Sequence, residues 1–123
     1  ANPALGEPAH LPFSKKSTDN WIYVDDCAEQ LVRLALKDKL NFSSYNTGSQ
    51  TVTGEELEKT VKKILPNAEI YFDEKNLRTP LIDDQDDSRI RKEIDFYPRS
   101  FAEGVRALIN DARKANNLPS IKA

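Results

Sequence analysis

Tyr71 and Lys75 are the first candidates for chemistry, because they match the spacing Y-x-x-x-K. A tyrosine can transfer a proton when a lysine beside its phenol lowers the phenol pKa. Both side chains must then lie on one face of a helix, one turn apart. The segment Ala68–Phe72 instead predicts a strand, with Ile70 and Phe72 on one side. Positions four apart in a strand are roughly 13 Å distant, so we interpret the match as coincidental.

An acidic run, Asp83-Asp84-Gln85-Asp86-Asp87, raises the question of a calcium-binding loop. Such a loop needs a glycine at its sixth position and a glutamate at its twelfth. Counted from the first aspartate, this chain has Ser88 and Ile94 there. A solvated loop that leads into a helix N-cap is therefore the favoured interpretation.

Three further residues have structural interpretations that outweigh catalytic ones. Gly48 is a lone glycine and predicts a turn, because a phosphate-binding loop needs several glycines before a helix. Cys27 lies among apolar helix positions without a nearby histidine or basic cluster, which favours a packed thiol over a nucleophile. His10 lies between prolines and is interpreted as a surface residue. The sequence thus predicts no catalytic residue, no cofactor-binding residue and no metal ligand in this chain.

Arg78 is the one charged residue that we single out for substrate binding. It lies in a long polar connection, 73–85, and ligand contacts concentrate in such connections. Its guanidinium group can bind phosphate oxygens through paired hydrogen bonds. The alternative is a solvated surface arginine, which is how we interpret Arg89 and Arg91.

Helical periodicity predicts three main helices that would position these residues. The first begins near Asp25 or Asp26, either of which can cap it, and ends near Lys37–Lys39. The second and third each follow a capping box, Thr53–Glu56 and Ser100–Glu103. In such a box a hydroxyl accepts from a free amide while the glutamate reaches back to the cap residue.

Shorter elements alternate with these helices. We predict strands at Trp21–Val24, Ser44–Thr47 and Ala68–Phe72, and a short helix from Asp86 or Asp87 to Glu93. The alternation gives an α/β or α+β fold, and the pattern alone leaves that choice open.

Three regions follow from these elements. We expect an irregular lead-in at residues 1–20, because it is proline-rich and aperiodic, an α/β domain at residues 21–115, and a frayed tail at residues 116–123.

Composition limits the class of protein. With 123 residues, 38% hydrophobic and 31% charged, the chain fits one modest globular domain. Its net charge of -2 comes from interspersed residues, which argues against a nucleic-acid or anionic-membrane partner. No apolar run is long enough for a membrane span. A single cysteine excludes an internal disulfide and is compatible with a reducing cytoplasm, where we expect the protein to lie.

Five short sequence words occur in one order along the chain. They are W-I-Y-V-D-D-C-A at Trp21–Ala28, Y-N-T-G at Tyr45–Gly48, D-D-S-R-I at Asp86–Ile90, E-I-D-F-Y-P-R at Glu93–Arg99 and S-F-A-E-G at Ser100–Gly104. In this order they resemble the C-terminal part of the extended short-chain dehydrogenase/reductases, the NAD-dependent epimerase/dehydratase family. The resemblance covers about three-quarters of the chain.

That resemblance implies a function for the longer protein. Members of the family bind NAD or NADP on an N-terminal Rossmann domain and act mostly on nucleotide-linked sugars, while the smaller C-terminal part contacts the substrate. It therefore implies that this chain is the substrate-binding portion of a nucleoside-diphosphate-sugar epimerase/dehydratase or related reductase. Its expected partners are a missing N-terminal Rossmann domain and a small-molecule substrate, for which a nucleotide sugar is one candidate. The glycine fingerprint and the true tyrosine–lysine pair would lie on that missing domain, so this chain alone would be inactive.

Two residues depart from the family pattern. Asp19 occupies a place where nucleotide-sugar enzymes often carry an arginine. An acid there would repel a diphosphate, which favours a different carbonyl or hydroxyl substrate as an alternative. Asp95 replaces the usual glycine, although aspartate tolerates left-handed backbone better than most residues. Arg78 lies roughly where the family has a phosphate-contacting arginine.

The sequence leaves a second class of function open, a stand-alone binding or interaction module on the same scaffold without catalysis. It also predicts uncovered apolar helix faces on Asp25–Leu36 and Phe101–Ala112. In the family such faces meet the missing domain, so we expect the isolated chain to self-associate or to bind a hydrophobic dye.

Overall fold

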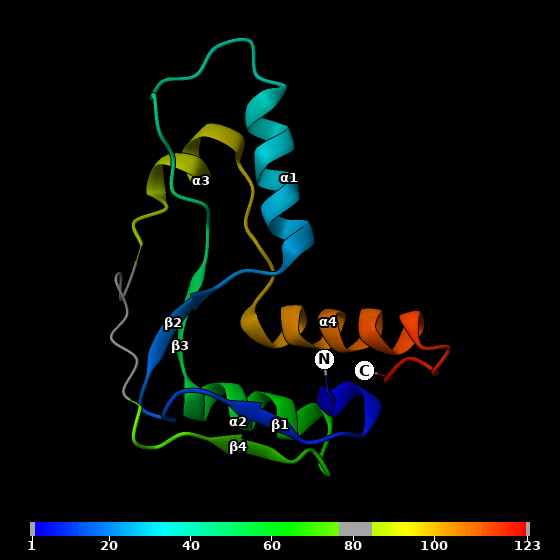
Figure 1. The fold of residues 1–123 in the computed structure, drawn as a ribbon. Helices are drawn as coiled ribbons and strands as arrows, with labels where there is room; N and C mark the ends of the chain where they lie inside the picture. Colours follow the sequence, from blue (N-terminus) through cyan, green and yellow to red (C-terminus); the bar gives the residue numbers. More distant parts are fainter. Residues whose placement is uncertain (1, 77–84, 123) are drawn as a thin grey trace.

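A computed structural model describes residues 2–76 and 85–122 of the chain (Figure 1). The elements in chain order are the 3-10 helix η1 (Asn2–Leu5), β1 (Ala9–Leu11), β2 (Thr18–Trp21), α1 (Val24–Ala35), β3 (Gln50–Thr53), α2 (Gly54–Ile64), β4 (Ile70–Phe72), α3 (Ser88–Ile94) and α4 (Phe101–Ala115). The predicted mixed α/β fold is confirmed. In the described part of the chain α1, α2 and α4 are the long helices, and the strands are short.

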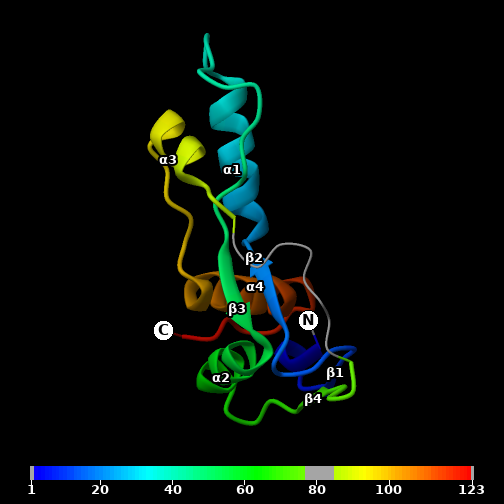
Figure 2. The same cartoon turned by 90° about the vertical axis from the view of Figure 1, so that its left-hand side faces the viewer.

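The molecule has an elongated, angular shape (Figures 1 and 2). An arm consists of α1, α3 and the connecting residues 36–49, and α3 packs beside α1. A base consists of α2, α4, η1, β1 and β4, in which α4 contacts both α2 and η1. The ribbon of β2 and β3 links the base to the arm. As a result α1 and α4 begin near one corner and then diverge (Figure 1).

Two small sheets within the described residues join segments that are distant in the sequence. β1 pairs with β4 in parallel, so that His10 lies opposite Tyr71. β2 pairs with β3 in antiparallel register, so that Thr18 lies opposite Thr53. The expectation of an irregular lead-in at residues 1–20 is therefore wrong, since it contains η1, β1 and most of β2. Strands of three or four residues are too short to show a period, and their partners lie much later in the chain.

The connection before β3 also differs from the prediction. The strand expected at Ser44–Thr47 does not form, and β3 begins only at Gln50. Between them the Gly48 amide donates to the Gln30 side-chain oxygen over 2.6 Å. A side chain of α1 thus takes the place of a strand neighbour at this point.

Both predicted capping boxes are confirmed. The Thr53 hydroxyl accepts from the Glu56 amide over 3.1 Å, and the Glu56 carboxylate accepts from the Thr53 amide over 2.7 Å. At the start of α4 the Ser100 hydroxyl accepts from the Glu103 amide over 3.3 Å, and the return bond measures 2.9 Å. These reciprocal bonds satisfy amides that a helix start leaves without intrahelical partners.

The start of α1 is different. Its N-cap residue is Tyr23, which makes no side-chain capping bond, so neither Asp25 nor Asp26 is the cap that we predicted. Both aspartates lie in the first turn, where their charge meets the positive end of the helix dipole. Asp26 instead contacts a distant part of the chain, as described below.

The tail is ordered against α4 as far as residue 122, contrary to the predicted fraying. The Arg113 side chain donates to the Pro119 carbonyl over 2.6 Å, and the Asn110 side chain accepts from the Ile121 amide over 2.8 Å. Arg106 donates to the Lys122 carbonyl over 3.0 Å. Half-buried polar side chains of α4, which gave no periodic signal, therefore hold the tail.

The buried core is thin. Among the described residues, the buried apolar side chains are Ala4, Ile90, Ile94 and Ile109, and the buried polar ones are Ser14, Ser17, Asp26, Gln30 and Glu93. In a self-contained domain polar residues are the minority of the fully buried set. Here the interior depends on hydrogen-bonded polar groups as much as on apolar packing.

Gly54 is required where α2 approaches the loop after β1. A Cβ atom at this position would lie 2.9 Å from the Lys15 Cα and 3.0 Å from a ring carbon of Phe72. We predict that Gly54→Ala lowers the free energy of unfolding by about 1–3 kcal/mol, because the backbone cannot yield as a flexible side chain would. Urea unfolding followed by circular dichroism measures this change. The adjacent exposed substitution Glu55→Ala serves as the control, and equal losses in both variants would contradict the packing argument.

Glu93 fastens the tip of the arm. Its buried carboxylate accepts from the Asn41 side chain over 2.9 Å and from the Asn41 amide over 3.3 Å, and Lys37 Nζ lies 3.7 Å away. The hydrogen bonds from Asn41, with help from the Lys37 charge, lower the pKa of Glu93 below its ordinary value of 4.5. The folded state therefore prefers the ionised carboxylate.

Acid should weaken this contact. Because the folded pKa of Glu93 is lowered, its stabilisation is complete above pH values near 4.5 and is lost as the pH falls through the lower folded pKa. We predict that Glu93→Gln is less stable than the parent at neutral pH, and that the difference shrinks toward pH 3. Urea unfolding at several pH values measures the difference, with Glu29→Gln on the exposed side of α1 as control. A difference that stays constant with pH would exclude this role.

Candidate functional site

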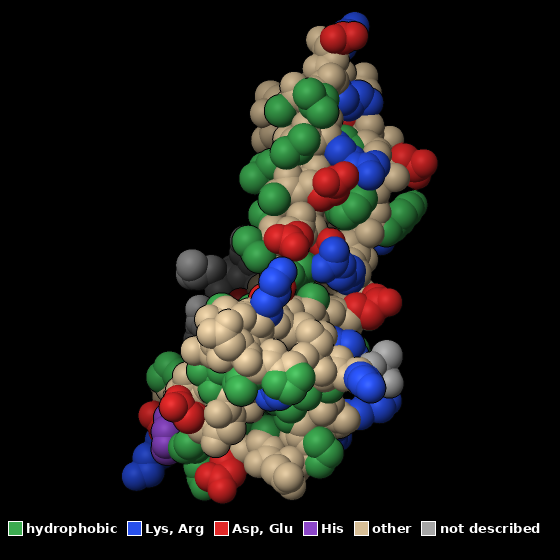
Figure 3. All heavy atoms as spheres, turned by 90° about the vertical axis from the view of Figure 1, so that its right-hand side faces the viewer, with side chains coloured by type: hydrophobic (Ala, Val, Ile, Leu, Met, Phe, Trp, Pro, Cys, Tyr) green, Lys and Arg blue, Asp and Glu red, His purple; other side chains and the backbone are tan. Residues whose placement is uncertain are grey.

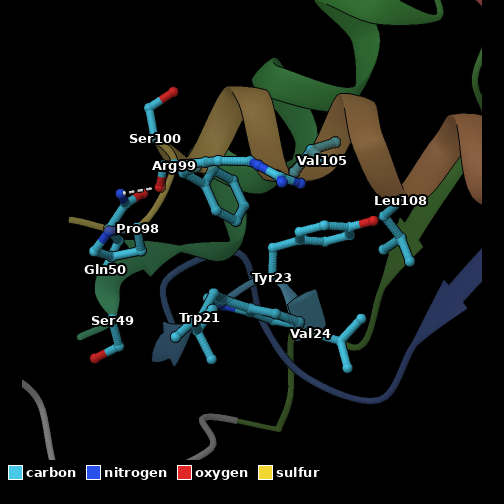
Figure 4. A pocket seen from close by; sticks show the side chains of 13 residues that line it. Trp21, Tyr23, Val24, Ser49, Gln50, Pro98, Arg99, Ser100, Val105 and Leu108 are labelled. Carbon is cyan, nitrogen blue, oxygen red and sulfur yellow. Dashed lines mark hydrogen bonds between the residues drawn. The ribbon is translucent and has the colours of Figure 1, made fainter. Parts of the chain in front are cut away.

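A cavity of about 230 Å³ lies in the corner where α1 and α4 begin (Figure 4). We call it the corner cavity. It is bounded by the end of β2, the first residues of α1 and α4, and the residues just before β3 and α4. The lining residues are Trp21, Ile22, Tyr23, Val24, Ser49, Gln50, Pro98, Arg99, Ser100, Phe101, Gly104, Val105 and Leu108.

Most of the cavity wall is apolar. The rings of Trp21 and Phe101 form one side of the cavity. Their centres lie 6.5 Å apart and their planes meet at 57°. Val24 and Leu108 lie at the opening, with exposed fractions of 66% and 53%. Large exposed side chains that line one recess indicate a surface built to be covered.

Two polar side chains around the cavity have hydrogen-bond partners within the chain. The Gln50 side chain donates to the Arg99 carbonyl over 2.8 Å, a bond marked in Figure 4. The Ser100 hydroxyl is engaged with Glu103 in the capping box of α4. A polar ligand entering the cavity would therefore have to compete with these internal bonds.

Arg99 is held by a buried carboxylate. The Asp26 side chain accepts from the Arg99 amide over 3.0 Å, and its second oxygen lies 3.6 Å from Arg99 Nε. The guanidinium group lies over the Tyr23 ring, 4.7 Å from its centre (Figure 4). A cation over an aromatic face is attracted by the ring quadrupole. The Asp26 and Tyr23 contacts thus fix the segment that leads into α4 against the start of α1.

Tyr23 is a structural phenol at neutral pH. Its hydroxyl makes a short hydrogen bond to the Asp111 carboxylate, which together with burial raises the pKa of Tyr23 to about 12. A phenol with this pKa stays protonated at pH 7 and is a poor proton acceptor. The corner cavity therefore offers an apolar recess rather than an acid–base pair.

Other chemistry has little support in the part of the chain that the structure describes. Residues 2–76 and 85–122 contain no cluster of three or more histidine, cysteine, aspartate or glutamate side chains placed to hold a metal ion. Over the same residues, no helix combines the length and apolar character that crossing a bilayer requires.

The structure places Tyr71 in strand β4, as predicted, so its spacing to Lys75 does not put both side chains on one helix face. Instead the Tyr71 ring stacks on His10 across β1 and β4, with ring centres 5.0 Å apart. Arg78 lies outside the described residues, and its role as a substrate contact stays a prediction. In the acidic run, Asp86 accepts from the Ser88 amide over 2.9 Å and so supports the start of α3.

Two residues from the sequence analysis have defined backbone roles. Asp95 ends α3 with φ 46°, the left-handed conformation that the resemblance led us to expect there. A Cβ atom at Gly48 would lie 3.2 Å from both an Asp87 oxygen and a Pro98 carbon. Gly48 thus permits close packing between the arm segments. Cys27 is a half-buried free thiol.

The sequence analysis missed the importance of Asp26, Gln30 and Arg99. Asp26 and Gln30 lie four residues apart and therefore share one face of α1, and both are buried. Their spacing of four residues was the only local signal, and it indicates a shared helix face but not what that face contacts. Nothing local to the sequence indicated that Gly48 and Arg99 supply those groups.

Comparison with known proteins identifies the fold. No protein-family model and no curated protein matches this sequence. Among solved structures, similar chains include a GalE-like L-threonine dehydrogenase from Cupriavidus necator, with a TM-score of 0.69, 20% identity and 86% of this chain covered. A partial consensus L-threonine 3-dehydrogenase gives a TM-score of 0.72, 20% identity and 92% of this chain.

A third solved structure is the UDP-glucuronic acid 4-epimerase from Bacillus cereus in complex with UDP-glucuronic acid and NAD, with a TM-score of 0.71, 18% identity and 89% of this chain. This chain spans 41%, 39% and 36% of the three structures respectively. It therefore matches less than half of each fold. The chain has the fold of one part of the extended short-chain dehydrogenase/reductases, the family that its sequence resembles.

Proposed function

We propose that this chain is the substrate-side part of a longer NAD(P)-dependent epimerase, dehydratase or related reductase, and that it is inactive alone. The observation that carries the proposal is the uncovered apolar face of α1, in a chain that spans only 36–41% of each similar structure. An apolar helix face exposed in isolation is explained when the remaining part of the fold covers it.

The orientation of α1 is unusual for a surface helix. Val24, Ala28, Leu31 and Ala35 follow helical spacing along one side, and all four are exposed. We call this row the α1 stripe. The side that faces the rest of the chain carries the buried residues Asp26 and Gln30. Figure 3 shows hydrophobic side chains exposed along the arm. A helix that turns its apolar row away from its own chain indicates a second surface on that side.

The total surface area supports the same conclusion. A compact monomer of 13.9 kDa exposes about 6,700 Å². This chain exposes 8445 Å², roughly a quarter more. Contacts between domains of one protein typically bury about 600–1,500 Å². The excess of about 1,700 Å² is somewhat larger than the area that such a contact buries.

The division of chemistry follows from the residues of this chain. The glycines lie at positions 6, 48, 54 and 104, so none of them forms a G-x-x-G-x-x-G phosphate-binding fingerprint. Hydride transfer needs a nicotinamide carrier, which the longer protein would have to hold on its other part. This chain would form one side of the substrate site, with Arg78 as the candidate contact.

The substrate class follows the same reasoning. Similar structures include both a threonine dehydrogenase and a UDP-glucuronic acid epimerase. By the family resemblance, Asp19 in β2 stands where nucleotide-sugar enzymes often carry an arginine, and a carboxylate in that position would repel a diphosphate. We therefore favour a hydroxyl or carbonyl substrate without a nucleotide over a nucleotide sugar.

Calorimetry tests the proposed division. We predict that titration of NADH or NADPH into the isolated chain gives no heat beyond dilution, whereas the longer protein binds one of them. The missing glycine fingerprint is the physical reason. Saturable binding of either nucleotide by the isolated chain would contradict the proposal, as would a longer protein that binds neither.

The α1 stripe generates a second prediction. We expect the isolated chain to self-associate or to enhance the fluorescence of a hydrophobic dye. Burying a leucine contributes about 1.5–3 kcal/mol, so Leu31→Lys should weaken self-association about tenfold or more. Leu40→Lys, at an exposed leucine of the loop after α1, is the matched control. Sedimentation over a range of concentrations measures the effect, and equal behaviour of both variants would count against the stripe.

A further inference from the structure

We propose that the corner cavity receives one apolar side chain, aromatic or branched aliphatic, from the cofactor-binding part of the longer protein. In this arrangement the inserted side chain anchors the two parts to each other. The inference rests on the proposed function, because it assigns the partner of the same uncovered face.

The size of the cavity fits one such side chain. A buried apolar cavity of roughly 150 Å³ is large enough to bind benzene. The corner cavity measures about 230 Å³, which accommodates a phenyl ring or a leucine side chain with its first methylene groups. Binding energy between protein surfaces concentrates on large side chains that fill desolvated pockets of this kind.

The chemistry of the wall favours an apolar occupant. Trp21, Phe101 and Val105 supply apolar surface. The Gln50 side-chain nitrogen donates to the Arg99 carbonyl, and the Arg99 guanidinium group is drawn toward Asp26 and the Tyr23 ring. A phosphate or sugar hydroxyl placed there would lose its hydration without gaining equivalent hydrogen bonds. An apolar group gives up no hydrogen bonds to water when it enters the cavity.

The cavity is continuous with the α1 stripe. Val24 begins the stripe and also lines the cavity, and Leu108 extends the same apolar surface onto α4. α1 and α4 diverge from this corner and form the two sides of an angle (Figure 1). A convex surface that covers the stripe would therefore present a side chain to the cavity. This continuity favours a protein surface over a free small molecule.

The share of the fold outside this chain identifies the occupant. In the similar structures, about three-fifths of each chain lies beyond the part that this chain matches. A covering surface is thus available within one longer polypeptide, with no association between separate molecules. A second copy of this chain and a free apolar ligand are the alternative occupants, and the experiment separates them.

Toluene, a mimic of the phenylalanine side chain, tests whether the cavity is open. Trp21 is the single tryptophan of the chain, so its indole N–H resonance reports occupancy by nuclear magnetic resonance. We expect toluene to shift this resonance saturably in the dilute isolated chain. Leu108→Lys should weaken toluene binding about fivefold or more. Tyr71→Lys is the matched control, since the two side chains are 53% and 51% exposed and Tyr71 lies on β4, away from the corner.

The longer protein supplies the decisive comparison. There the resonance, assigned with a Trp21→Phe variant, should not respond to toluene, because the covering part already fills the cavity. Equal toluene binding by both proteins would overturn the inference in favour of a free ligand. A cavity closed to toluene at every dilution of the isolated chain would also overturn it, because dilution removes any second copy and no open recess would then exist for a side chain to enter. Neither result affects the nucleotide titrations, which test the proposed function independently of this inference.

Discussion

The hydrogen bonds that Asp26 and Gln30 make to distant backbone amides are the constraint on which the rest of this structure depends. Asp26 accepts from the Arg99 amide, and Gln30 accepts from the Gly48 amide. Each buried side chain satisfies a backbone group that would otherwise be unpaired, which makes either bond costly to lose. Together they hold the face of α1 that carries Asp26 and Gln30 against the rest of the chain, and the α1 stripe faces outward.

The outward direction of the α1 stripe connects the fold to its proposed role. A self-contained domain gains its stability by directing apolar rows into one core, and this chain keeps only a thin core. The uncovered stripe and the corner cavity meet at Val24, on the side where we propose that another part of the fold docks. The base, with its capped helices and ordered tail, gives that surface a rigid support. The substrate would then be enclosed between two parts of one longer protein.

The elements that the sequence predicted well are those that local chemistry determines. The capping boxes Thr53–Glu56 and Ser100–Glu103 fix where α2 and α4 begin, because both partners lie within one turn. The left-handed conformation of Asp95 was indicated by the family resemblance, because Asp95 replaces a glycine in the motif at Glu93–Arg99. The pairing of β1 with β4 was missed, since strands of three residues carry no period and their partners are about sixty residues apart.

The candidate site was harder to predict for the same reason. Trp21, Val24, Phe101 and Leu108 come from segments about eighty residues apart, and nothing local indicates that they share one recess. The strand expected at Ser44–Thr47 does not form, and the Gly48 amide that follows it donates to the Gln30 side chain of α1 instead of to a neighbouring strand. The apolar row of α1 was visible in the sequence, but its outward direction follows only from the buried contacts of Asp26 and Gln30.

Side-chain footprinting of α1 tests the central claim most directly. Hydroxyl-radical labelling of Val24 and Leu31 would be compared between the isolated chain and the longer protein, with Tyr71 as an internal reference. The account predicts strong labelling of both α1 residues in the isolated chain and marked protection in the longer protein, with Tyr71 unchanged. Equal labelling of Val24 and Leu31 in the two proteins would show that nothing covers the stripe and would contradict the account.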